Sequence, residues 1–192
     1  VGFLPRLGDV DDIVWVDVPV GYAFHPMNAF DNDDGSVTID LCKYEKLFDT
    51  DLRGPFGDGL PRLERWNVNP ESRSVTIDVI DERANEFPRH RHDVGGQPYR
   101  YGYSVSISSD PTDGWQTLKH DLQSGETMVF DHGAGRAGGE AVFVPKEASN
   151  EEDAGYLMTF VHNLNNDSAE FVVIDAQDFS RGYVAQVKIP KR

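Results

Sequence analysis

Cysteine, long apolar runs and positive charge are all scarce in this sequence. Its 192 residues include one cysteine, Cys42, which excludes an internal disulfide and favours a reducing, cytoplasmic compartment. No run approaches the roughly 18 consecutive apolar residues that a membrane-spanning helix needs. Asp and Glu number 33 against 18 Lys and Arg, a formal net charge of −15. Such a charge repels phosphate backbones and argues against nucleic acid as a partner.

The common enzyme motifs are also missing. The sequence contains no HExxH, GxSxG or GxxxxGK[ST] motif, and a single cysteine provides no pair of thiolates for zinc. The glycine-rich residues 133–140 do not follow a strand and open a helix, as a nucleotide-binding fingerprint would. These absences argue against a zinc protease, an α/β-hydrolase and a nucleotide-binding enzyme.

Two acidic clusters are the candidates for a cation-binding surface. They are DNDDG (31–35) and EED (151–153). The first resembles a calcium loop but has Cys42 where such a loop has its twelfth-position glutamate. A hairpin turn therefore explains this cluster better, and solubility or a salt-rich habitat explains the overall acidity.

Alternation of apolar and polar residues, with many β-branched side chains and hardly any helical periodicity, predicts about eleven short strands. They span residues 13–18, 36–44, 62–68, 74–80, 99–107, 116–121, 126–131, 141–145, 155–164, 170–175 and 183–189. Hairpin turns are expected at DNDDG, NPESR (69–73), QSGE (123–126) and NNDSA (165–169). Hairpin pairs that recur every ~50 residues favour propeller blades over a sandwich or barrel. We expect an all-β fold with about three blades of a partial propeller, as a single domain over residues 1–192.

His25 stands apart from the other histidines because it lies in the apolar, aromatic run YAFHPMNAFD. A buried neutral imidazole can offer one nitrogen to a metal while a carboxylate fixes the other, although a satisfied core histidine fits the residues equally well. Glu86 and Glu140 open apolar segments, where a carboxylate needs a partner. They can hydrogen-bond metal-bound histidines or pair with arginines such as Arg89 or Arg136.

The remaining histidines are expected at the surface or satisfied by neighbours rather than bound to a metal. They are His90, His92, His120, His132 and His162. Of these, the first two lie two residues apart and would share a face of an extended chain, but a solvated basic patch is the simpler interpretation.

Nine segments, taken in order, resemble those of a known family. They are FHPMNAFD (24–31), DLCKYEKLFD (40–49), LERWNVN (63–69), NEFPR (85–89), YRYGYSV (99–105), LKHDLQSGE (118–126), GGEAVFVP (138–145), GYLMTFV (155–161) and VVIDAQDF (172–179). The family is that of the carotenoid oxygenases, which includes carotenoid and apocarotenoid cleavage dioxygenases, lignostilbene dioxygenases and a retinoid isomerase. The likeness covers nearly the whole chain, and the combination of segments is specific although no single one is.

The resemblance implies a seven-bladed β-propeller with non-haem iron(II), Fe(2+), held by four histidines. His25 matches the third of these ligands, Glu86 the carboxylate that fixes His25, and Glu140 the carboxylate that fixes the fourth ligand. The first two histidines would precede Val1, and the fourth would follow Arg192. We therefore expect a C-terminal portion of a longer enzyme, inactive without the remainder of the propeller.

The activity that the resemblance implies is oxidative cleavage of a conjugated C=C bond by O2, which gives two carbonyl products. The substrate would be an apolar carotenoid, apocarotenoid or stilbene that enters through a tunnel, with Phe24, Met27 and Phe87 as candidate lining residues. Any peripheral membrane contact would run through segments outside this stretch. Two alternatives stay open: a non-catalytic propeller module that binds another molecule, and a family member that isomerises or binds a retinoid-like lipid.

Overall fold

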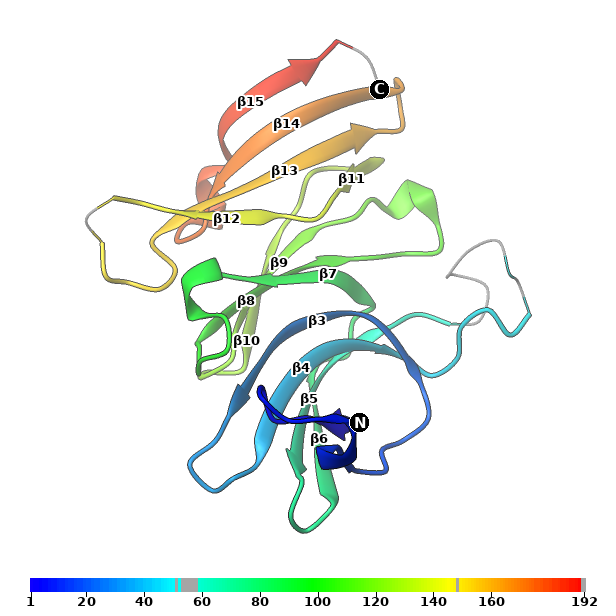
Figure 1. The fold of residues 1–192 in the computed structure, drawn as a ribbon. Coiled ribbons are helices and arrows are strands. Elements are labelled where there is room, and N and C mark those ends of the chain that lie inside the picture. Colours follow the sequence, from blue (N-terminus) through cyan, green and yellow to red (C-terminus); the bar gives the residue numbers. More distant parts are fainter. Residues whose placement is uncertain (51, 53–58, 148, 191–192) are drawn as a thin grey trace.

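The structure is a computed structural model that describes residues 1–50, 52, 59–147 and 149–190, and three antiparallel sheets dominate it (Figure 1). The first sheet has the order β3 (Tyr22–Asp31), β4 (Val37–Tyr44), β5 (Arg62–Asn69) and β6 (Ser74–Asp81). The second has the order β7 (Asn85–His90), β8 (Tyr101–Ser106), β9 (Thr117–Asp121) and β10 (Glu126–Phe130). In the third, β11 (Arg136–Gly138) and β12 (Val142–Pro145) both pair with β13 (Gly155–Asn163), which is followed by β14 (Ser168–Asp175) and β15 (Tyr183–Ile189).

The rest of the regular structure is small. A two-stranded sheet joins β1 (Gly2–Phe3) to β2 (Val14–Trp15), so the strand expected over residues 13–18 is much shorter than predicted. The helices of the described part are short 3₁₀ turns: η1 (Val10–Asp12), η2 (His92–Val94), η3 (Pro111–Asp113) and η4 (Phe179–Arg181). None of these helices is long and apolar enough to cross a membrane.

The expected hairpin turns lie where the turn chemistry placed them. They join β3 to β4, β5 to β6, β9 to β10 and β13 to β14. Each turn contains a residue with positive φ, namely Gly35, Arg73, Gly125 and Asp167. Glycine adopts this left-handed conformation without strain and Asp tolerates it better than most residues, which is why such sequences form tight turns.

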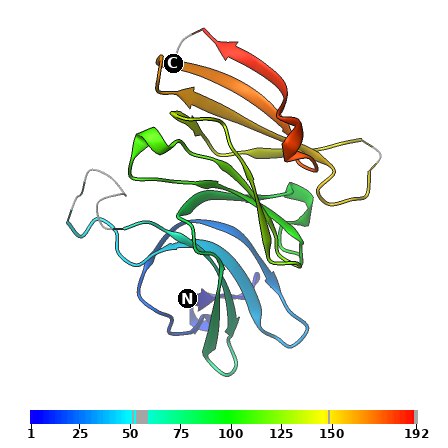
Figure 2. The same cartoon turned by 180° about the vertical axis from the view of Figure 1, so that it is seen from behind.

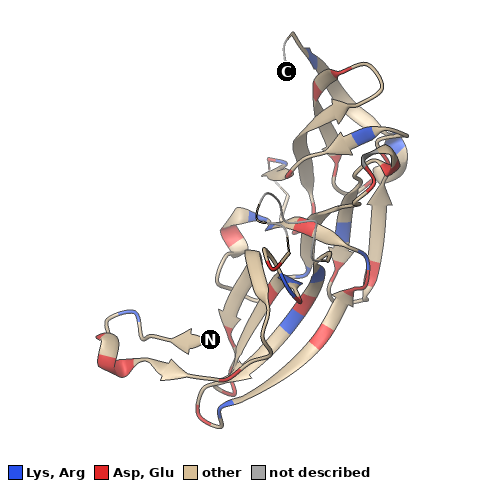
Figure 3. Ribbon diagram, turned by 90° about the vertical axis from the view of Figure 1, so that its right-hand side faces the viewer, with Lys and Arg blue, Asp and Glu red and all other residues tan. Residues whose placement is uncertain are grey.

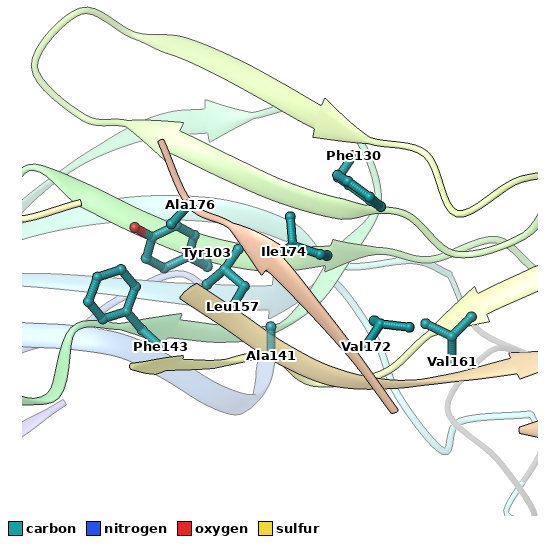
Figure 4. Packing of buried hydrophobic residues seen from close by; sticks show 9 residues of the cluster. All are labelled: Tyr103, Phe130, Ala141, Phe143, Leu157, Val161, Val172, Ile174 and Ala176. Carbon is teal, nitrogen blue, oxygen red and sulfur yellow. The ribbon is translucent and has the colours of Figure 1, made fainter. Parts of the chain in front are cut away.

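Neighbouring sheets lie side by side in both views (Figures 1 and 2). Apolar side chains fill the space between them. The largest cluster joins the second sheet to the third and comprises Tyr103, Phe130, Ala141, Phe143, Leu157, Val161, Val172, Ile174 and Ala176 (Figure 4). Burial of a side chain such as Leu157 contributes about 1.5–3 kcal/mol. This packing fixes the position of one sheet against the next.

Charged residues are spread along all three sheets and their turns (Figure 3). The acidic turn DNDDG forms local hydrogen bonds, in which the Asp34 carboxylate accepts from the backbone N–H and the hydroxyl of Ser36. The second acidic cluster also has protein partners. Glu152 accepts hydrogen bonds from the backbone N–H groups of Arg100 and Tyr101. Asp153 accepts a hydrogen bond of 2.6 Å from the ammonium of the buried Lys119. Both clusters therefore have structural roles in this chain.

The edge strands β3, β7 and β12, here called the inner strands together with β11, form a row, because β3 lies against β7 and β7 lies against β12. The pairing of each sheet's first strand is interrupted. In β3 it shifts between Ala23 and Pro26 and again between Pro26 and Asn28. In β7 it shifts between Glu86 and Arg89, and in the third sheet residues 139–141 separate β11 from β12. Such bulges bend a strand and redirect its side chains.

Candidate metal site at the inner strands

His25 and Glu86 meet across the boundary between the first and second sheets. The His25 Nδ1 lies 2.7 Å from the Glu86 Oε2. The Glu86 side chain is 5% exposed, whereas the His25 side chain is 44% exposed. A buried carboxylate thus holds one nitrogen of a ring whose other side is open.

Local backbone geometry brings the two side chains together. His25 lies in the first bulge of β3, just before Pro26, which has no N–H to donate to a neighbouring strand. Glu86 lies at the bulge of β7, and Phe87 after it has a φ of 54°. The Phe87 N–H donates to the Glu86 Oε2 at 2.7 Å. A positive φ at a bulky residue is strained, and such strain concentrates at functional sites.

The hydrogen bond fixes the roles of the polar atoms of His25 and Glu86. A carboxylate oxygen only accepts, so the His25 Nδ1 donates this hydrogen bond, and in the neutral ring Nε2 then keeps its lone pair. The Glu86 Oε1 is buried, and the Glu86 carboxylate also interacts with the hydroxyl of Tyr44. Burial and the nearby Glu86 charge raise the pKa of the Cys42 thiol and of the Tyr44 hydroxyl. Both groups therefore stay neutral beside the pair.

Two aromatic rings lie close to His25. The Phe87 ring centroid lies 5.5 Å from the His25 centroid and that of Phe24 lies 6.0 Å from it. Phe24 also contacts Phe48, a loop residue with a φ of 58° that the sequence interpretation did not single out. Met27 differs from these residues, because it is 3% exposed and packs with Cys42 and Leu63 in the core. The structure thus gives Met27 a packing role, while Phe24 and Phe87 flank His25.

Glu140 has an arginine partner. It lies in the gap between β11 and β12, and its Oε1 is 2.6 Å from the Arg89 Nε. The two side chains are 37% and 51% exposed. Of the two kinds of partner that the sequence left open for Glu140, this structure contains the arginine. Glu86 and Glu140 therefore contact different partners on different strands.

The other histidines lie away from this pair or have full sets of partners. His120 and His132 are buried with both ring nitrogens in hydrogen bonds. His90 ends β7 and His92 begins η2, so these two do not share one extended strand. His162 lies 3.2 Å from Asp167 in a hairpin. None contacts His25 among the described residues.

One imidazole does not make a metal site. Among the described residues, no three His, Cys, Asp or Glu side chains gather closely enough to hold a metal ion. The Nδ1-protonated tautomer of His25 nevertheless fits a single metal ligand, because a carboxylate that fixes one nitrogen of a ligand histidine is the usual arrangement. The residues present fit part of an iron site with further ligands from elsewhere.

Comparison with known proteins identifies the family of this chain. The whole chain, residues 1–192, matches the family described as retinal pigment epithelial membrane protein. The chain belongs to this family. It is the carotenoid oxygenase family that the sequence motifs resemble.

Three curated relatives illustrate the range of this carotenoid oxygenase family. A carotenoid cleavage oxygenase of Mycobacterium tuberculosis is 34% identical over 100% of this chain and 40% of the relative. An apocarotenoid-15,15'-oxygenase of Synechocystis is 30% identical over 97% of this chain and 39% of the relative. An isoeugenol monooxygenase of Pseudomonas nitroreducens is 30% identical over 100% of this chain and 44% of the relative. The chain thus spans about two fifths of the length of these relatives.

Solved structures of the carotenoid oxygenase family show the same fold. The crystal structure of cobalt-substituted Synechocystis ACO aligns with a TM-score of 0.88 and 28% identity, over 100% of this chain and 41% of that one. A crystal structure of an ACO/RPE65 chimera gives the same TM-score of 0.88 at 27% identity. The expected fold is therefore confirmed: the three sheets are blades of a seven-bladed β-propeller.

Proposed function

We propose that this chain forms part of a non-haem iron(II) dioxygenase that cleaves a conjugated C=C bond of an apolar alkene to two carbonyl products. The contact between His25 and Glu86 in a member of the carotenoid oxygenase family carries this proposal. Carotenoids, apocarotenoids and stilbenes are the proposed substrates, with O2 as co-substrate. The names of the relatives support this class, since they include carotenoid and apocarotenoid oxygenases.

His25 would bind iron through Nε2, with further ligands from segments outside these 192 residues. When bound, iron(II) supplies the centre at which dioxygen is activated. Glu86 keeps the proton on Nδ1, so that the lone pair of Nε2 stays directed away from the carboxylate. Because Glu86 is buried, its charge adds to the electron density of the ring with little screening from water.

The aromatic residues would hold the alkene and exclude water. Phe24 and Phe87 flank His25, so a flat conjugated substrate can pack against their rings beside the metal. The lining role of these two residues is part of the proposal. Glu140 lies in the same row of inner strands and is paired with Arg89. It would orient a further ligand histidine only after that histidine replaces Arg89 as its partner.

The alternative of a non-catalytic propeller module is less well supported. It predicts that His25, Glu86 and Glu140 are scattered in space, yet His25 and Glu86, far apart in the sequence, lie in hydrogen-bond contact, while Glu140 pairs with Arg89. We place the enzyme in the cytoplasm, which is supported by a single, buried cysteine.

A chimera tests the proposed function. This chain would replace the matching part of the Synechocystis apocarotenoid-15,15'-oxygenase, which supplies the remaining segments. We expect the chimera to bind iron and to convert an apocarotenoid with O2 into two carbonyl products. We expect His25→Ala to abolish cleavage and lower the iron content, whereas the matched control His162→Ala leaves both unchanged. Full cleavage by the His25→Ala chimera would refute the assignment of His25.

A further inference from the structure

Asn28 joins β3 to the second sheet through a saturated set of hydrogen bonds. Its Nδ2 donates to the backbone carbonyls of Val94 and Gln97 at 3.3 and 3.2 Å. Its Oδ1 accepts the N–H of Gly96 at 3.0 Å and the N–H of Ala29 at 2.9 Å. The side chain is 7% exposed, and two donors and two lone pairs are all that a side-chain amide has. The loop around η2 is therefore held to β3 at one point.

Two other residues of the same short segment also contact the second sheet. His25 meets Glu86 of β7. Met27 fills a notch at Gly102 of β8, where an added Cβ would lie 2.2 Å from the Met27 sulfur. The segment of residues 25–28 thus makes three kinds of contact with its neighbour: a hydrogen bond to a carboxylate, apolar packing and the amide hydrogen bonds of Asn28.

These contacts are needed because the β3–β4 pairing is weak at this point. Its register shifts on both sides of Pro26, which itself lacks an N–H. The ladder with β4 pairs Ala23, Pro26 and Asn28 but leaves His25 unpaired in the bulge, so it does not by itself fix the orientation of the His25 side chain. Side-chain contacts with the second sheet have to do so.

We propose that Asn28 is a positioning residue for His25. It anchors the far end of the bulged segment, three residues from His25, to a loop of the sheet that also carries Glu86. With that end fixed, the His25 ring meets the Glu86 carboxylate in one orientation and one tautomer. Without it, the bulged segment is free to shift, and the His25 Nδ1–H loses its fixed acceptor.

The metal-binding role of His25 rests on the proposed function, but its orientation by Asn28 does not. The experiment therefore uses the metal-free chain. Nuclear magnetic resonance of the ¹⁵N-labelled imidazole at about pH 8.5, where histidines are neutral, reports which ring nitrogen carries the proton. We expect a single Nδ1–H tautomer for His25 in the unsubstituted chain, and a mixture of tautomers in Glu86→Ala, which removes the acceptor and so defines the loss of the contact.

Asn28→Ala should shift the His25 signal toward that of Glu86→Ala. Asn28→Asp keeps the size and the acceptor oxygen but turns a carboxylate oxygen toward the carbonyls of Val94 and Gln97, so it should cause a shift of the same sign that is at least as large. Asn32→Ala is the matched control, because the Asn32 amide bonds Ser36 and Thr38 within the first sheet. It should leave His25 unchanged.

Three outcomes would overturn the inference. One is an unaltered Nδ1–H tautomer in both Asn28 variants. Another is an equal shift in Asn32→Ala, because His25 would then respond to any change in this hairpin. The third is loss of folding in both Asn28 variants, since Asn28 would then hold the whole fold rather than His25. An inactive chimera with a normal Asn28 effect would count against the proposed function alone.

Discussion

The stability of the fold at low pH should depend on His120 and His132. These two buried histidines lie at successive boundaries between sheets. The His120 nitrogens contact the hydroxyls of Ser104 and Thr127 at 2.8 and 3.0 Å, and its ring lies 3.7 Å from Asp81 of the first sheet. The His132 nitrogens contact the hydroxyls of Thr117 at 2.9 Å and of Tyr183, in the third sheet, at 2.8 Å. Burial lowers the pKa of each ring to about 4. Both rings are therefore neutral in the folded chain at neutral pH.

We expect the chain to lose stability on acidification, because each ring binds a proton more weakly in the folded chain than in the unfolded chain. In the unfolded chain each ring titrates near its ordinary value of 6.5. Because the folded pKa is the lower one, the stabilisation is complete above about pH 6.5 and disappears as the pH falls toward 4. At pH 5 each histidine lowers the free energy of unfolding by about 2 kcal/mol, from linkage with the two pKa values. Two such losses are a large fraction of the ~5–15 kcal/mol typical of a domain.

Urea unfolding of the 192-residue chain at pH 7.5 and pH 5.0 measures this effect. Carboxylates also titrate in this range, so the informative quantity is the difference between variants. We expect His120→Gln and His132→Gln each to reduce the pH-dependent loss by about 2 kcal/mol. The exposed His92→Gln serves as the control and should keep the full loss. An identical pH dependence in all four proteins would refute the argument.

Three further expectations follow from individual contacts. Glu86→Gln in the chimera should lower iron affinity by about 10–100-fold, measured by metal titration, because it removes the charge that orients a ligand histidine; unchanged affinity would contradict this role. Gly102→Ala should destabilise the chain by about 1–3 kcal/mol in urea unfolding through its clash with Met27, and Met27→Ala in the same chain should recover part of that loss if the clash is the cause. Lys119→Met should cost about 3–5 kcal/mol because it leaves Asp153 without its cation; a loss below 1 kcal/mol would show that water replaces the lysine.

The sequence predicted the regular part of the fold well. Alternating segments separated by glycine- or asparagine-containing turns gave the hairpins of all three sheets, because turn chemistry is local. The strands that were not predicted are β3 and β7, which carry His25 and Glu86, together with the short β1 and β11. Both β3 and β7 contain a proline and a bulge, so neither shows the two-residue alternation by which strands are found.

The candidate site was accessible only through family motifs. Spacing along the sequence gives no hint that His25 and Glu86 meet, since their contact depends on how two sheets pack. The sequence assigned no role to Asn28, although an asparagine inside an apolar run is itself a signal of a buried polar contact. The Arg89 partner of Glu140 was one of two arginines that local sequence allowed, and nothing in the sequence distinguished them.

The interrupted inner strands make this protein unevenly tolerant of changes in length. In a hairpin turn an added residue enlarges a loop in solvent, at a cost that grows slowly with loop length. Removal of one residue from the bulge beside His25 or Glu86 would instead restore regular pairing and turn every following side chain of that strand to the opposite face. Insertions and deletions should therefore survive selection in the turns near Gly35, Gly125 and Asp167, and be eliminated from residues 23–28 and 86–89. In a library of single-codon deletions, the variants that still fold should carry their deletions in these turns, and deletions within residues 23–28 and 86–89 should be missing.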